Sequence, residues 1–224
     1  MEIVMNRESA LKAIRENVKN ENLIKHMLAT EAIMRALARR FNPATCYSSA
    51  PAGGGKSCDP REVALFREPP APAGGGSTEN EDEWGLAGLL HDIDVELTHA
   101  DLKVHSKPGA EMAKQLGASE AICRAILVHN EAHGEPCMSL MDKALFCADP
   151  LTGLITAGAL IRPDKKLASV EAKSIRKRFK EERFAAGANR EQIAKCSDIG
   201  LELDAFIELG LEAMKGVAGD LGLA

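Results

Sequence analysis

Helical spacing of apolar residues is the feature that most constrains this fold. Between Leu23 and Phe41, apolar side chains recur at steps of three and four residues, with charged residues between them. This spacing predicts a long amphipathic helix with one buried face. Similar spacing returns in several segments after residue 80, and neither a strand pattern nor an internal repeat is visible. The sequence therefore predicts an all-α fold, a helical bundle.

Helix-start signals divide the chain into separate helices. The first 41 residues are expected to be helical with a break near Asn20. Ser106, followed by Pro108, is expected to cap one later helix, and Ser139 with Asp142 forms the S-x-x-D start of another. Pro150 could interrupt the helix that starts at Ser139 before this helix resumes. The helices expected after the N-terminal region cover residues 83–92, 106–117, 119 onward, 139–161, 165–189 and 203–217.

One Pro/Gly-rich stretch separates two helical regions. Residues 42–79 hold six of the ten prolines and two Gly triplets. Such a stretch neither propagates a helix nor buries much surface, which predicts a flexible insert. We therefore expect a helical core at 1–41 and 80–161, the insert at 42–79, and a C-terminal helical extension at 162–224 packed on the core.

Composition excludes several classes of partner. With 224 residues the chain can bury about 70–75% of its unfolded surface in one core. Its net charge of −5 argues against general nucleic-acid binding, which needs a basic face. No apolar stretch is long enough to span a bilayer, and the charged start lacks a signal-peptide core. Six cysteines without a C-x-x-C pair fit reduced thiols, so we expect a cytoplasmic protein.

Titratable residues stand in apolar surroundings. His91 and Asp92 directly follow an apolar run, Asp149 follows another, and His26 lies among apolar residues of the first long helix. Burying such groups is costly unless they are paired or bind a metal. Adjacent helical residues point about 100° apart, so other helices must complete a metal site. Together the four would offer imidazole and carboxylate ligands, which suit Mn, Fe, Co, Ni, Zn or, less well, Mg.

The order of these four residues resembles the signature of the HD-domain superfamily of metal-dependent phosphohydrolases. That signature is a His, then a His-Asp doublet, then a distant Asp, and His26, His91, Asp92 and Asp149 match it in turn. The resemblance covers residues 8–41 and 81 to about 215. It implies a helical bundle around a divalent metal that activates water for attack on a phosphate ester.

Local sequence narrows the resemblance to an uncharacterised bacterial subgroup of HD hydrolases. The two stretches that carry it are residues 85–94, around the doublet, and 144–153, around the last aspartate. The chain differs from the family pattern between the first histidine and the doublet. There the family usually has a short connection, whereas this chain has the insert at 42–79. A flexible insert closes a loop at little extra entropic cost, so the site can survive it.

Further histidines lie between the doublet and the last aspartate. Larger members of the superfamily bind a second metal through such residues, and His105 and His129 fall in this interval. The resemblance therefore allows a second ion bound by these two side chains. We expect His99 and His133, in loops, to be exposed to solvent.

The resemblance also suggests roles for carboxylates near the doublet. Asp92 is the natural bridging or water-orienting carboxylate. Asp94 and Glu96 could act as general base or acid if they reach the water, or they could be exposed loop carboxylates. Lys103 and Lys107 are candidate phosphate contacts. Members of the superfamily act on nucleotides and on other phosphomonoesters or diesters, so we expect a small phosphorylated substrate.

Three functions stay open at this stage. The first is a phosphohydrolase. The second is an HD-type di-iron oxygenase similar to myo-inositol oxygenase, which would need two redox-active iron ions. The third is a helical module that binds a ligand or partner without turnover. The C-terminal helices could pack on the core or form a homodimer.

Overall fold

The computed structural model describes residues 5–41 and 80–224, and within these ranges it contains helices and no strand. This confirms the all-α prediction. The predicted insert at 42–79 lies outside the described residues. Short 3-10 helices occupy Glu131–His133, Leu167–Ser169 and Lys195–Ile199. The α-helices are α1 Arg7–Asn17, α2 Glu21–Phe41, α3 Glu81–Leu90, α4 Lys107–Gln115, α5 Glu120–Val128, α6 Leu140–Leu160, α7 Ala172–Phe179, α8 Arg190–Ala194, α9 Leu203–Gly216 and α10 Ala218–Leu221.

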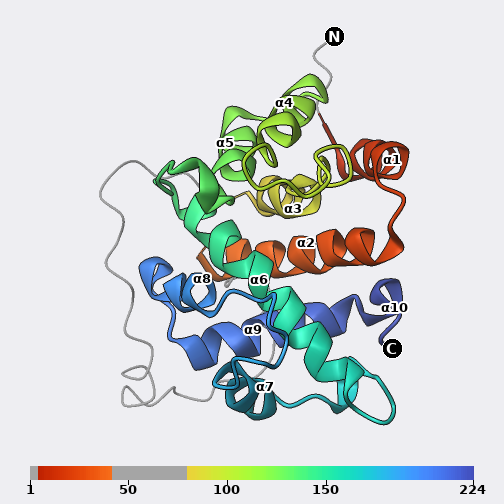
Figure 1. Ribbon diagram of the computed structural model, residues 1–224, viewed down its shortest axis with the longest axis vertical. Coiled ribbons are helices and arrows are strands. Elements are labelled where there is room, and N and C mark those ends of the chain that lie inside the picture. The colour runs from red at the N-terminus through yellow and green to blue at the C-terminus, as the bar shows by residue number, and fades with distance from the viewer. Residues whose placement is uncertain (1–4, 42–79) are drawn as a thin grey trace, which may run out of the picture.

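Helix α2 crosses the middle of the molecule and packs against α3, α6 and α9 (Figure 1). Helices α3, α4 and α5 lie on one side of α2, and α7 and α9 lie on the other (Figure 1). Met27, Ile33, Met34 and Leu37 of α2 are fully buried, as the three- and four-residue spacing predicts. Because α2 contacts both halves, a side chain on it can meet groups from α3 and from α6.

Helix α6 supplies the other long element of the site. The Ser139 hydroxyl accepts the backbone N–H of Asp142 and the Asp142 carboxylate accepts that of Ser139, which is the capping box expected from the sequence. Pro150 does not interrupt the helix, which runs on to Leu160. Pro150 removes one intrahelical hydrogen bond. Leu151 and Leu154 just beyond it are fully buried, and their packing offsets that loss.

Two other expectations about helices are wrong in detail. Ser106 stands just before α4, but its backbone is left-handed (φ 75°) and its hydroxyl donates to the carbonyl of Leu127 instead of capping the helix. The expected helix at 165–189 is confined to α7. Beyond α7, the guanidinium of Arg190 binds carbonyls of the 181–188 segment, which holds that segment in turns.

Helix α3 lies unusually close to α2. A Cβ added to Gly88 would lie 2.9 Å from both Met34 Cγ and the carbonyl oxygen of Thr30, so only glycine fits there. Beside this contact the buried Glu31 carboxylate pairs with Arg7 of α1 and Arg35 of α2. The close approach brings the end of α3, where the His-Asp doublet stands, next to α2.

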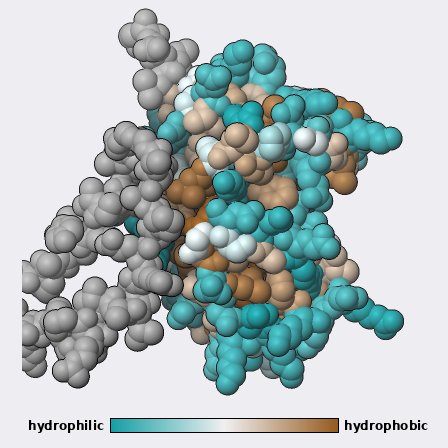
Figure 2. All heavy atoms as spheres, turned by 90° about the vertical axis from the view of Figure 1, so that its left-hand side faces the viewer, coloured by the Kyte–Doolittle hydropathy of each residue, from teal (hydrophilic) through white to brown (hydrophobic). Residues whose placement is uncertain are grey.

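In the parts of the chain that the structure describes, no helix combines the length and the apolar character needed to cross a bilayer. The face shown in Figure 2 is mostly hydrophilic, with hydrophobic patches near its middle.

Candidate metal centre

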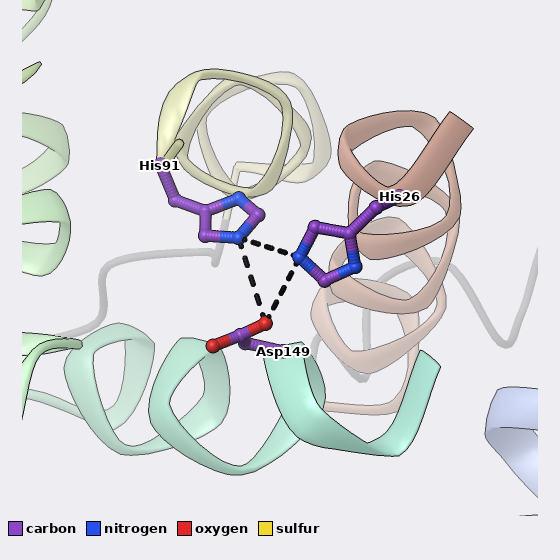
Figure 3. Close-up of side chains that lie close together, drawn as sticks. All are labelled: His26, His91 and Asp149. Atoms are coloured by element: carbon purple, nitrogen blue, oxygen red, sulfur yellow. Dashed lines mark hydrogen bonds and ion pairs between the residues drawn. The ribbon is translucent and has the colours of Figure 1, made fainter. Parts of the chain in front are cut away.

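Four side chains from three helical regions meet at one point. His26 comes from α2, His91 and Asp92 from the end of α3, and Asp149 from α6; Figure 3 shows the two imidazoles and the Asp149 carboxylate turned toward one another. His26 Nε2 lies 3.1 Å from His91 Nε2 and 3.0 Å from Asp149 Oδ1. Asp92 Oδ2 lies 3.3 Å from each of the two imidazole nitrogens.

These separations suit one divalent ion. Two ligand atoms that are each ~2.1 Å from a metal lie ~3.0 Å apart at a right angle and ~3.4 Å apart at a tetrahedral angle. The measured separations run from 3.0 Å, between His26 and Asp149, to 3.6 Å, between His91 Nε2 and Asp149 Oδ1. The residues present therefore fit a bound metal without rearrangement.

The tautomers of the two imidazoles also favour a metal. His91 Nδ1 donates to the carbonyl of Gly88 at 2.8 Å. His26 Nδ1 lies 2.8 Å from Thr152 Oγ1, whose own proton goes to the carbonyl of Asp149, so Nδ1 must donate here too. Both Nε2 atoms then carry lone pairs that face each other. Either a proton or a metal ion must lie between them.

A second group of candidate ligands shares Asp92. Asp92 Oδ1 lies 3.2 Å from His105 Nε2 and 3.6 Å from His129 Nε2, and the two nitrogens are 3.2 Å apart. Their Nδ1 atoms are bound elsewhere, His129 to the carbonyl of Ile126 and His105 to Asp94. One oxygen of Asp92 thus faces each group. Asp92, His105 and His129 would thus be able to hold a divalent ion of their own, which would supply Lewis-acid chemistry.

Asp94 orients the second group. Its Oδ1 accepts from His105 Nδ1 at 2.8 Å, and its Oδ2 accepts the backbone N–H groups of Ser106 and Gly109 at 2.8 and 3.0 Å. The carboxylate therefore caps α4, the role expected of Ser106. A Cβ on Gly109 would lie 3.0 Å from Asp94 Oδ1, so glycine permits this approach. Asp94 is fully buried, which corrects the reading of it as an exposed loop carboxylate.

The structure does not bring the other predicted residues into the centre. Glu96 Oε1 instead accepts the backbone N–H groups of Lys19 and Asn20, between α1 and α2. Lys103 and Lys107 are exposed. Among the described residues, neither ammonium forms a hydrogen bond or ion pair with a ligand of the centre, because both side chains point into solvent from the segment around His105.

Two histidines outside the centre differ from each other. His99 is exposed, as expected. His133 is half-buried, which corrects the expectation of exposure: its Nε2 lies 2.6 Å from the carbonyl oxygen of His105 and 3.1 Å from Ser106 Oγ. Asn130 Nδ2 donates to the same carbonyl at 3.0 Å. Together they hold the segment that carries His105 against the end of α5.

The comparison with known families agrees with this geometry. The family model described as HD domain matches residues 23–177, more than half of the chain. The chain belongs to the HD-domain family. This family lies within a superfamily of metal-dependent phosphohydrolases. No curated protein and no solved structure matches the chain.

Carboxylates of this HD domain control the charge of its imidazoles. Burial alone would lower the pKa of His26, but hydrogen bonds to Asp149 and Asp92 outweigh it and raise the pKa to about 9. Burial would likewise lower the pKa of His105, but hydrogen bonds to Asp92 and Asp94 outweigh this effect and raise the pKa to about 9. Burial would raise the pKa of Asp92, yet the adjacent His91 and the other imidazoles hold it well below its usual value. Metal ions must therefore displace protons to bind.

This charge arrangement predicts a pH effect on the metal-free protein. The imidazole pKa values are raised above their unfolded value near 6.5, so their stabilisation is complete below about pH 6.5 and is lost as the pH rises to about 9. Each unit of pKa difference contributes about 1.4 kcal/mol. Urea unfolding with a chelator should show this loss between pH 6.5 and 9. Metal-loaded protein, whose imidazoles are already deprotonated, should lack it, and equal pH profiles for both forms would contradict the prediction.

Proposed function

We propose that this HD domain hydrolyses a phosphate ester of a small molecule, a monoester or diester, at a centre of two divalent ions. The observation that carries the proposal is the placement of Asp92, with one oxygen toward His26 and His91 and the other toward His105 and His129. Two ions so placed would polarise a phosphoryl oxygen and lower the pKa of a bound water.

Each residue has a distinct task in this proposal. His26, His91, Asp92 and Asp149 would hold one ion, and Asp92 with His105 and His129 would hold the other. Asp94 acts as a positioning residue, since both of its oxygens are already bound by the protein. Thr152 fixes His26 through Nδ1 in the same manner. A proton released from water near the centre would meet Asp149, the ligand carboxylate most open to solvent.

Metal content and a phosphatase panel test the proposal together. We expect the purified protein to carry about two divalent ions per chain and to hydrolyse small phosphate esters once loaded with Mn, Co, Ni or Mg, with activity lost to a chelator and restored by metal. Oxygen uptake by the iron-loaded protein without phosphatase activity would favour the oxygenase instead. An absence of bound metal, with stability unchanged on adding it, would overturn the metal centre and leave a non-catalytic helical module.

A further inference from the structure

A cavity of about 560 Å³ adjoins the metal centre. Its walls come from the first turns of α2, the second half of α6, the turn segment before α8, and the end of α10 with the residues that follow it. Its volume lies within the range of about 300–1,000 Å³ typical of small-molecule sites. The residues of α2 and α6 that line it stand within about three turns of His26 and Asp149.

His26 belongs both to the metal centre and to the cavity wall, together with its partner Thr152. The centre is partly open to solvent at His26, which lines the cavity, and at Asp149, which lies outside the lining among the described residues. The side chains of His26 and Asp149 are 25% and 28% exposed, whereas His91 is fully buried and His129 is 4% exposed. A substrate whose phosphate reaches the ions from this side would have its organic group in or beside the cavity.

The lining is apolar and built from small residues. Ala157, Leu160, Ala188 and Leu221 are typical of its walls, and among the residues that the structure describes no carboxylate lines it. Within residues 5–41 and 80–224, Lys25 is the one lysine or arginine in the lining, and the other polar side-chain groups there are amide, hydroxyl and imidazole. The alanine, glycine and leucine side of these walls cannot replace the hydrogen bonds that a polyhydroxy group would lose there, but it gains free energy by burying a ring or alkyl group.

The wall formed by the turn segment is held firmly. The guanidinium of Arg190 donates to the carbonyl oxygens of Ala185 and Ala188, each at 2.6 Å, and to those of Phe184 and Glu181. The side chain of Arg190 thus fixes the segment from which Ala185 and Ala188 line the cavity. The cavity is therefore preformed, which reduces the entropic cost of binding.

We propose that this cavity is the subsite for the organic group of the substrate, and that this group is largely apolar, an aryl or alkyl group instead of a polyhydroxy one. This inference rests on the proposed phosphohydrolase function. It goes beyond that function by naming the class of ester that the protein selects and the residues that select it.

Gly153→Leu is the variant that tests the subsite. A Cβ at Gly153 would meet only Ala188 Cβ, at 4.0 Å, so a side chain can enter the cavity there without a backbone clash. Replacing glycine inside α6 also favours the helix, so the variant should fold. Ala121→Leu, on an exposed position of α5, is the matched control.

The substrates are 2-naphthyl phosphate, glycerol 2-phosphate and a nucleoside monophosphate, with metal-loaded protein. We expect the natural sequence to prefer 2-naphthyl phosphate over glycerol 2-phosphate by about tenfold or more in kcat/KM. Gly153→Leu should lose about tenfold for the naphthyl ester through KM and little for glycerol 2-phosphate. Ala121→Leu should change neither. Faster turnover of the nucleotide than of 2-naphthyl phosphate would overturn the preference for an apolar group, because the phosphate of a nucleotide is carried on a hydroxylated ribose.

Equal effects of Gly153→Leu on both small esters, or a natural preference for glycerol 2-phosphate, would overturn the subsite and leave the phosphohydrolase standing. If no ester is hydrolysed, the proposed function fails and calorimetry decides the subsite. Binding of 2-naphthyl phosphate more tightly than inorganic phosphate, lost in Gly153→Leu but kept in Ala121→Leu, would retain the subsite, and equal binding of the two would reject it.

Discussion

Asp92→Asn is expected to remove both bound ions together and to lower kcat/KM for phosphate esters by about a thousandfold or more, a loss of ~4 kcal/mol in transition-state stabilisation. The reason is that Asp92 presents one oxygen to each ligand group. The amide keeps the size of the side chain but loses its charge, and only one of its two terminal atoms can ligate a cation. Metal analysis after dialysis, with kinetics on the same sample, measures both effects.

Two controls distinguish a shared ligand from general damage. Asp220→Asn removes a carboxylate at an exposed position and should leave metal content and activity unchanged. Asp149→Asn should weaken only the ion bound by His26 and His91, since Asp149 contacts no residue of the second group among the pairs described. Retention of two ions by Asp92→Asn would show that Asp92 does not bridge them.

Asp94→Asn is expected to empty the second site while leaving the first occupied. The buried carboxylate accepts three N–H groups, two from the backbone and one from His105. An amide has only one acceptor oxygen, and if that oxygen keeps the two backbone groups, its NH₂ group faces His105 Nδ1. The imidazole would then carry its proton on Nε2, the nitrogen that faces His129. Affinity for the second ion should fall by about 10- to 100-fold.

The measurement for Asp94→Asn is metal stoichiometry, which should fall from about two ions to about one at limiting free metal. Thr152→Val provides the reciprocal control, because it removes the hydroxyl that accepts from His26 Nδ1 and should weaken the first ion instead. Thermal unfolding of both variants checks that each still folds. If Asp94→Asn lost both ions equally, or neither, the carboxylate would not be a positioning residue specific to His105.

Regular elements of this fold were predictable because their signals are local. The capping box of Ser139 and Asp142 and the apolar spacing along α2 depend on residues only a few positions apart. The segment between α3 and α4 has no such period. Its course depends on hydrogen bonds between distant residues, such as those that Asp94 makes to Ser106 and Gly109. The continuation of α6 through Pro150 likewise depends on packing that no local pattern records.

The meeting of the side chains in the candidate metal centre was predictable for a different reason. A histidine or aspartate at the end of an apolar run must find a partner, and His26, His91, Asp92 and Asp149 each carry that signal. The residues that orient the imidazoles carry weaker signals. Thr152 reads as an ordinary helical threonine, although its spacing of three from Asp149 does place both on one side of α6. His133 also carries only a weak signal in the sequence, because its contact with the backbone of His105 joins positions far apart in the chain.

The Nδ1 atom of each imidazole in the centre forms a hydrogen bond within the protein, with Gly88, Thr152, Ile126 or Asp94. The imidazole rings therefore keep their orientation whether or not a cation is bound between them. Exchanging one metal for another requires little change in the surrounding helices. Selection among Mn, Fe, Co, Ni and Zn would then follow their relative supply in the cell and the order of intrinsic affinities more than the shape of the fold.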